Sequence, residues 1–308
     1  MIIDSHVHYL DYLQETRGFD FIAKQMDEAD VSHAIICGMP LVKQWDEHTQ
    51  TKPKDARAND SRLYYYSATD YILMEQYQKQ KEEIQKRFFP FVCGINPTDR
   101  NAVNHIRRLL EIYPDSIYGI GEIFGRHGNI TYLTYGENPR ADHPALMEIY
   151  DLAADKNLPV LLHNDISSFR AKEPIHLGEM NRALSHNRKT KIIWAHMGAY
   201  GTVSVLNILE IAERMLEQNE NLYYDVSVAF YYWVRKDISG WANLIQKYPN
   251  RFLLASDIVP PYERYDYKLY YIERYTGLTN LLDEEIKNKL THGNALRLLN
   301  VQIDECDI

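Results

Sequence analysis

Eight short apolar runs recur along the chain, separated by segments with a helical pattern. The runs are apolar throughout instead of alternating with polar residues, as expected for parallel strands that are buried on both faces. Strands that alternate with helices predict βαβ units, and eight units within about 250 residues fit a (β/α)8, or TIM, barrel. A doubly wound α/β sheet is the alternative, but no glycine-rich fingerprint follows the first run. The runs are residues 2–8, 33–39, 88–95, 117–123, 159–164, 191–196, 222–227 and 252–257.

No linker, repeat or low-complexity tract divides the chain, so we expect one barrel domain over 1–300 and an acidic C-terminal tail over 301–308. Two long polar segments interrupt the alternation: 40–68 follows the second predicted strand and 124–141 follows the fourth. Both should lie over the C-terminal face of the barrel, where long loops form lids or pocket walls. The predicted helices are 19–29, 70–87, 99–112, 142–156, 174–186, 201–218 and 237–248.

The composition excludes several classes of protein. The 308 residues carry a net charge of −9 and contain no long basic run, which argues against nucleic acid as the main partner. No stretch approaches ~18 consecutive apolar residues, and the N-terminus lacks the regions of a secretory signal. Cys37, Cys93 and Cys306 are odd in number and far apart. We therefore expect no membrane partner and a cytoplasmic protein with reduced thiols, of which Cys37 and Cys93 should pack in the core.

Polar residues that can carry chemistry stand at the ends of five predicted strands. His6 and His8 end the first strand, and their i, i+2 spacing places both side chains on one face. Two adjacent imidazoles can clamp a divalent metal. Taken singly, such residues are often buried core histidines or helix caps, but a barrel brings its strand ends into one ring. The other members of this ring are Glu122 on the fourth strand, His163 on the fifth, His196 on the sixth and Asp257 on the eighth.

The words around these residues carry a family resemblance. "DSHVH", "LLHND", "WAHMG", "LLASD" and the late "GNALRLL" resemble the amidohydrolase superfamily of metal-dependent barrels. They are similar in particular to its amidohydrolase-related branch, which holds hydrolases, lactonases and non-oxidative decarboxylases. The resemblance runs from His6 to Leu299 and implies a small-molecule substrate, but it does not identify which one.

The resemblance also implies roles for the ring. His6, His8 and Asp257 resemble the ligands of a first metal, and His163 a ligand of the first or a second metal. His196 resembles either a ligand of the second metal or a free catalytic histidine that polarises the substrate. Asp257 would double as the general base that acts on metal-bound water. Imidazole and carboxylate ligands suit Zn²⁺, and Mn²⁺, Fe²⁺ and Ni²⁺ stay open.

The fourth strand departs from the family pattern. Many members place a carboxylated lysine there as a bridge between two metals, whereas this chain has "GIGEI". Glu122 would replace the lysine as the bridge, as a glutamate does in some hydrolase branches. The prediction is therefore a hydrolase with one or two metals. Alternatively, Glu122 pairs with Arg126 or His127 and touches no metal.

Two further classes of function stay open. A non-oxidative decarboxylase would need one metal, an unligated His196 and an arginine for the substrate's carboxylate. A barrel without activity could serve as a binding protein, although the complete set of predicted ligands argues against this. Predicted substrate-binding residues are Arg126, through its planar guanidinium, and Tyr231 and Trp233 in "FYYWV" (230–234). Alternatively, the aromatic residues pack against the barrel rim, and a homo-oligomer stays open.

Overall fold

Eight parallel strands form one sheet in the order β1-β2-β5-β6-β7-β8-β9-β10. The computed structural model describes residues 1–45, 52–53, 56, 61–128, 130–168, 170–198, 205–227, 234–260 and 274–303. The strands are β1 (Ile3–His8), β2 (His33–Cys37), β5 (Phe88–Val92), β6 (Gly119–Phe124), β7 (Val160–His163), β8 (Ile192–Trp194), β9 (Leu222–Asp225) and β10 (Phe252–Leu253).

The first and last strands meet and close the sheet into a barrel. Val7 in β1 forms a parallel bridge with Ile258, just after β10. The amide of His8 donates to the carbonyl of Ile258 at 2.9 Å, and the amide of Ser5 donates to the carbonyl of Leu254 at 2.9 Å. The predicted single-domain (β/α)8 barrel is therefore confirmed.

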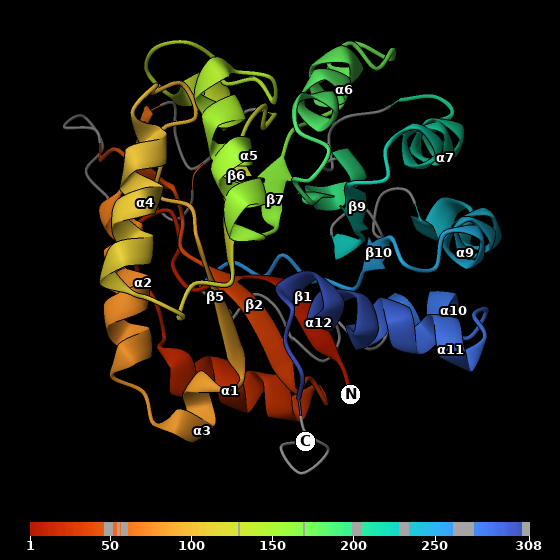
Figure 1. Ribbon diagram of the computed structural model, residues 1–308, viewed down its shortest axis with the longest axis horizontal. Coiled ribbons are helices and arrows are strands. Elements are labelled where there is room, and N and C mark those ends of the chain that lie inside the picture. The colour runs from red at the N-terminus through yellow and green to blue at the C-terminus, as the bar shows by residue number, and fades with distance from the viewer. Residues whose placement is uncertain are drawn as a thin grey trace.

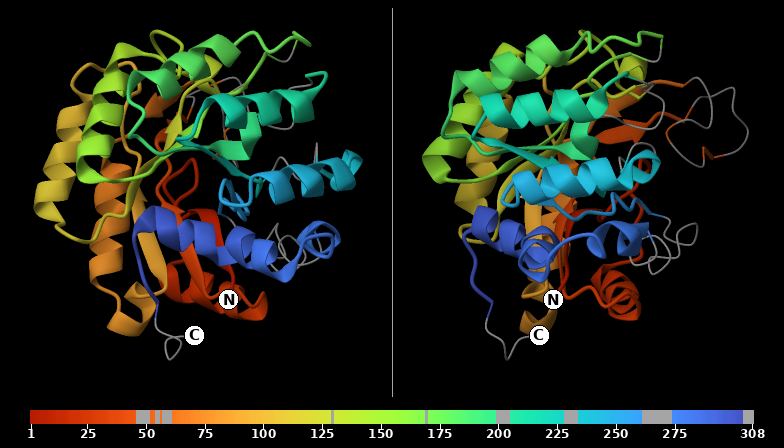
Figure 2. Two further views of the ribbon diagram at one scale, coloured as in Figure 1. Left: turned by 45° about the vertical axis from the view of Figure 1, so that its right-hand side comes forward. Right: turned by 90° about the vertical axis from the view of Figure 1, so that its right-hand side faces the viewer.

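Helices surround the strands on the outside of the barrel (Figures 1 and 2). They bury apolar stripes at helical spacing, such as Val103, Ile106 and Leu109 in α4. Among the described residues, no helix is both long enough and apolar enough to cross a membrane. The α-helices are α1 (Phe19–Glu28), α2 (Ala68–Gln78), α3 (Glu82–Gln85), α4 (Ala102–Ile112), α5 (Pro144–Lys156), α6 (Leu177–His186), α7 (Ile208–Gln218), α9 (Ile238–Lys247), α10 (Arg274–Thr279), α11 (Glu284–Asn288) and α12 (Asn294–Leu299); shorter helical turns are η1 (Thr131–Leu133), η2 (Ala195–Gly198), η3 (Val234–Lys236) and η6 (Lys289–Gly293).

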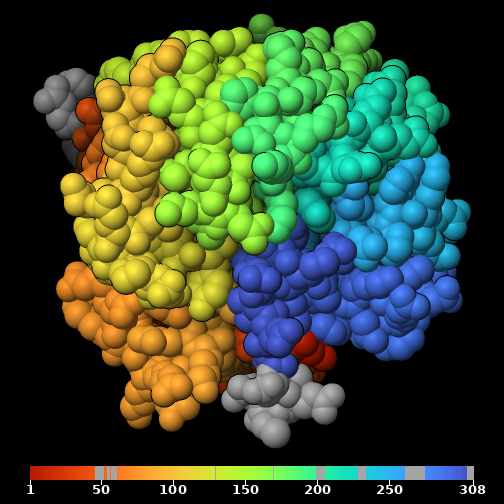
Figure 3. Space-filling model, in the orientation of Figure 1, coloured from red at the N-terminus to blue at the C-terminus, as the bar shows by residue number. Residues whose placement is uncertain are grey.

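The interior of the barrel is a separate apolar cluster. Alternate residues of a strand point to opposite faces, so Ile35 and Cys37 of β2 join an inner cluster with Phe91, while Ala34 and Ile36 join the cluster that contains the helices. At the C-terminus, α12 and the partly buried Val301 and Ile303 pack against the inner cluster. Figure 3 shows this C-terminal segment, in blue, beside the red residues of the N-terminus.

The two long loops contact one another. The segment 40–68 contains an antiparallel hairpin that the sequence did not predict, formed by β3 (Leu41–Lys43) and β4 (Leu63–Tyr65). Leu63 of this hairpin forms a parallel bridge with Thr134 in the loop that follows β6. The loops after the second and fourth barrel strands are thus joined on the same side of the molecule.

Candidate metal centre

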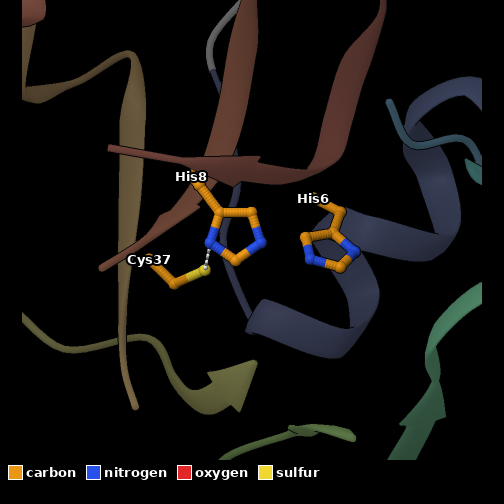
Figure 4. A group of neighbouring side chains, drawn as sticks. All are labelled: His6, His8 and Cys37. Carbon is orange, nitrogen blue, oxygen red and sulfur yellow. Dashed lines mark hydrogen bonds between the residues drawn. The ribbon is translucent and has the colours of Figure 1, made fainter. Parts of the chain in front are cut away.

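His6 and His8 project side by side from the end of β1. A register irregularity between Asp4 and Val7 brings both imidazoles onto the inner face, where their ring centroids lie 5.2 Å apart. Figure 4 shows the two adjacent rings, with the thiol of Cys37 facing His8. Both histidines are fully buried, so the clamp predicted from the sequence lies inside the barrel.

Two carboxylates face both imidazoles. Oε2 of Glu122 lies 3.3 Å from Nε2 of His6 and 3.2 Å from Nε2 of His8. Oδ1 of Asp257 lies 3.5 Å and 3.4 Å from the same two nitrogens. Donor atoms that share a tetrahedral cation at about 2.1 Å lie about 3.4 Å from one another. We call His6, His8, Glu122 and Asp257 the first ligand group, and its spacing fits a divalent metal.

The other oxygen of Glu122 faces a second pair of imidazoles. Oε1 lies 3.0 Å from Nδ1 of His163 and 3.5 Å from Nε2 of His196. Oδ2 of Asp257 lies 3.7 Å from Nε2 of His196. We call Glu122, His163 and His196 the second ligand group. Glu122 therefore turns one carboxylate oxygen toward each group, while Arg126 pairs with Glu179.

Each of the four histidines uses its remaining ring nitrogen in a hydrogen bond within the described structure. Such bonds fix the tautomer and orientation of an imidazole that binds a metal. Nε2 of His6 is buried without a hydrogen-bond partner, as expected for a nitrogen that coordinates a cation. The four bonds join His6 Nδ1 to Asp225 Oδ2 at 2.7 Å, His8 Nδ1 to Gly38 O at 2.9 Å, His163 Nε2 to Asp165 Oδ1 at 3.2 Å and His196 Nδ1 to Ser227 Oγ at 2.6 Å.

The electrostatics of the cluster favour a bound cation. Burial alone lowers the pKa of His6, but the negative charges of Glu122 and Asp257 raise it well above its usual value. Burial alone raises the pKa of Glu122, but His6 and the hydrogen bond from His163 hold it well below its usual value. Protons and a metal therefore compete for the same nitrogens, beside a carboxylate that remains anionic.

Cys37 lies against this site, although the sequence indicated only a packing role. The thiol is buried as predicted, and its Sγ lies 3.5 Å from Nδ1 of His8. Burial alone raises the pKa of Cys37, whereas the hydrogen bond from Cys93 and the charge of His8 hold it well below its usual value. Cys37 is thus a potential sulfur donor next to His6 and His8.

Arg126, which the sequence predicts to bind the substrate, and its neighbour His127 each contact a residue outside their own loop. Arg126 pairs with Glu179 of α6, and its backbone amide donates to Oδ1 of Asn164 at 3.1 Å. His127 stacks on His163, with ring centroids 3.8 Å apart and an interplanar angle of 5°. Tyr231 and Trp233 lie outside the described residues. Substrate binding by Arg126 stays a prediction.

Sequence reasoning missed Asp225 and Ser227, which support two of the histidines. Asp225 ends β9 and is fully buried, as is Ser227 two residues later. The signal was present, because Asp225 is a carboxylate within the seventh apolar run, as Glu122 is within the fourth.

The chain matches the sequence profile of the family described as Amidohydrolase over residues 3–301. The protein belongs to the amidohydrolase family. The family resemblance inferred from the strand-end motifs is therefore confirmed. No curated protein sequence matches this chain.

Solved structures share the fold at low sequence identity. An amidohydrolase from Burkholderia multivorans with bound zinc matches with a TM-score of 0.62 and 13% identity, covering 98% of this chain and 100% of its own. A probable 2-pyrone-4,6-dicarboxylic acid hydrolase from Acinetobacter baumannii, with citric acid bound, matches at 0.62 and 13%, covering 97% and 99%. The 2,6-dihydroxybenzoate decarboxylase from Rhizobium matches at 0.59 and 14%, covering 97% and 98%.

Family membership and the buried donor groups together indicate a metal-dependent enzyme. The choice between hydrolysis and decarboxylation needs an argument from the site, because one barrel fold supports many reactions.

Proposed function

We propose that this amidohydrolase is a hydrolase of a small molecule that uses two divalent cations, with Zn²⁺ as the preferred metal. The first ligand group would hold one cation and the second ligand group the other. The proposed ligands are His6, His8, Glu122, His163, His196 and Asp257, and Asp257 and His196 are also the proposed catalytic residues.

The observation that carries this proposal is the position of Glu122 between the two groups. Its Oε2 faces His6 and His8, and its Oε1 faces His163 and His196. Two cations about 3.5–4 Å apart repel one another, and an anion between them offsets that repulsion. A site for a single metal would need only one of these oxygens.

Asp257 is the proposed general base. Its side chain is 11% exposed, whereas that of Glu122 is 2% exposed, so Asp257 is the cluster carboxylate with greater access to solvent. A divalent cation in such a site lowers the pKa of bound water from ~15.7 toward ~7 and polarises a carbonyl group. Asp257 would take the proton released there, and Nε2 of His196, 3.7 Å from Oδ2 of Asp257, would help to orient it.

Metal analysis tests the proposal. We expect wild-type protein to hold close to two ions per chain, and Glu122→Gln to lose metal and activity together because a neutral amide offsets less charge. Glu75→Gln is the control, since it changes an exposed carboxylate outside both ligand groups. Full metal content in Glu122→Gln, or one ion in the wild type, would favour the mononuclear alternative, a decarboxylase with His196 unligated.

We further propose that the protein acts in the cytoplasm on a small molecule. The free thiols of Cys37 and Cys93 and the net charge of −9 support this location and argue against nucleic acid. Sedimentation of the metal-loaded protein would establish whether it forms a homo-oligomer.

A further inference from the structure

Strand β9 belongs to neither ligand group, yet its end lies directly behind both. Asp225 is the last residue of β9, and Ser227 follows at the i+2 position. Their side chains are fully buried. The hydroxyl of Tyr275 in α10 donates to the carbonyl of Ala255 at 2.5 Å and lies 3.3 Å from the carbonyl of Ser227. The backbone that carries these two side chains is therefore held in place beside the end of β10.

Asp225 makes a short hydrogen bond with His6 of the first ligand group. The distance from its Oδ2 to Nδ1 of His6 is 2.7 Å. This is the length of a charge-assisted hydrogen bond, and it is shorter than the separation of about 3.4 Å between two donors of one tetrahedral cation. Asp225 is therefore placed to orient His6 and not to share a cation with it.

Ser227 makes the corresponding bond in the second ligand group. Its Oγ lies 2.6 Å from Nδ1 of His196. The amide of Ser227 also donates to Oδ1 of Asp225 at 2.8 Å. A continuous chain of hydrogen bonds thus runs from His6 through Asp225 and Ser227 to His196, on the side of the imidazoles away from Glu122.

We propose that Asp225 and Ser227 are positioning residues for two different cation positions, Asp225 for the first ligand group and Ser227 for the second. This inference rests on the proposed function. Each residue would fix one imidazole in the tautomer whose Nε2 lone pair points to the metal. The carboxylate is the stronger acceptor, so Asp225 should have the larger effect on metal affinity.

Zn²⁺ titration of metal-free protein against a chromophoric chelator tests the two assignments separately. His163→Ala disables the second ligand group, and His8→Ala disables the first. In the His163→Ala background we expect Asp225→Asn to weaken Zn²⁺ binding about 10–100-fold and Ser227→Ala to have little effect. In the His8→Ala background we expect the reverse, with recovery of affinity in Ser227→Thr.

The inference would be overturned if Asp225→Asn left the Zn²⁺ affinity unchanged in the His163→Ala background. It would also be overturned if Asp225→Asn weakened Zn²⁺ binding equally in both backgrounds. Wild-type protein that takes up no Zn²⁺ would instead contradict the proposed function, which distinguishes the two failures. If neither background takes up Zn²⁺, Asp225→Asn is titrated without a second substitution and compared with the wild type. We then expect Asp225→Asn to bind one of its two ions more weakly than the wild type does. Thermal melting checks that each variant is folded, and if Asp225→Asn fails that check, Ser227→Ala and Ser227→Thr carry the test.

Discussion

Arg126 and Glu179 are joined by three hydrogen bonds of 2.7–3.0 Å, in which Nε and Nη2 of the guanidinium donate to both carboxylate oxygens. The bond connects the segment after β6 to helix α6. The side chains are only 17% and 10% exposed. A substrate carboxylate that bound Arg126 in this way would have to displace the carboxylate of Glu179. The Arg126–Glu179 pair therefore stabilises the fold, whichever substrate the protein takes.

Glu179→Gln should therefore destabilise the fold. We expect the free energy of unfolding to fall by about 1.5–3 kcal/mol, because hydrogen bonds between charged groups are lost from a shielded site. Urea denaturation measures the change. Glu75→Gln is the control, since Glu75 pairs with Lys79 on an exposed helix surface, where a loss of about 0–1 kcal/mol is usual. Equal losses in the two variants would contradict the expectation.

His176 should make stability fall at mildly acidic pH. Burial, followed by the nearby charge of Arg126, lowers the pKa of His176 below its usual value. On acidification the unfolded chain takes up a proton near pH 6.5, before the folded protein does. The stability contributed by neutral His176 is therefore complete above about pH 6.5 and is lost as the pH falls below it.

The variant His176→Gln isolates this contribution. Between about pH 7.5 and pH 5, we expect its free energy of unfolding to fall less than that of the wild type. Urea denaturation at each pH gives the difference between the two proteins, in which the titration of other groups cancels. If the free energies of unfolding of the two proteins change in parallel with pH, His176 does not contribute to the loss of stability.

Gly121 should tolerate no side chain. Its φ is +133°, and a Cβ there would lie 2.2 Å from the carbonyl oxygen of Leu161. Gly136 has a φ of +91° but nothing within 4 Å of the added carbon. We expect Gly136→Ala to cost about 1–3 kcal/mol from backbone strain alone. Gly121→Ala should cost more and also lower metal content, because Glu122 is the next residue. Melting curves and metal analysis of both variants provide the comparison.

Asp257→Asn should abolish turnover while allowing substrate to bind. An amide cannot accept the proton, and general-base catalysis contributes ~10²–10⁴-fold to the rate. The assay requires a substrate that the wild type turns over, with metal content followed in parallel because Asp257 is also a proposed ligand. Asp151→Asn alters an exposed carboxylate paired with His186 and should leave the rate unchanged. A near wild-type rate with full metal would exclude Asp257 as the base.

The ring of polar residues at the strand ends was predictable, because a barrel brings the C-terminal ends of its strands together. Buried parallel strands read as apolar runs, so a histidine or carboxylate at the end of a run is conspicuous. The partners of the histidines were harder to find. The carbonyl of Gly38 has no sequence signal, and Asp225 stood in a run without a metal-binding residue beside it.

The remaining differences come from contacts that hydrophobic periodicity does not reveal. The β3–β4 hairpin pairs Leu41 with Tyr65 across a long polar stretch without regular alternation. The helix predicted over 70–87 is two helices, α2 and α3, because the side-chain amide of Gln85 donates to the carbonyls of Tyr77 and Gln80 at 3.0 and 3.1 Å. Hydrophobic periodicity carries no information about a side chain that binds the backbone of a helix end.

The amide of Asp257 donates to the carbonyl of His6 at 2.9 Å. The first strand of the barrel and the segment after its last strand therefore meet within the first ligand group. During synthesis on the ribosome, His6 and His8 emerge long before Asp257. A nascent chain therefore carries a pair of imidazoles without the last carboxylate, and full cation affinity would arise only when translation and closure are complete. A cation bound across this seam would act as a clasp that favours the closed barrel over forms in which β10 has separated.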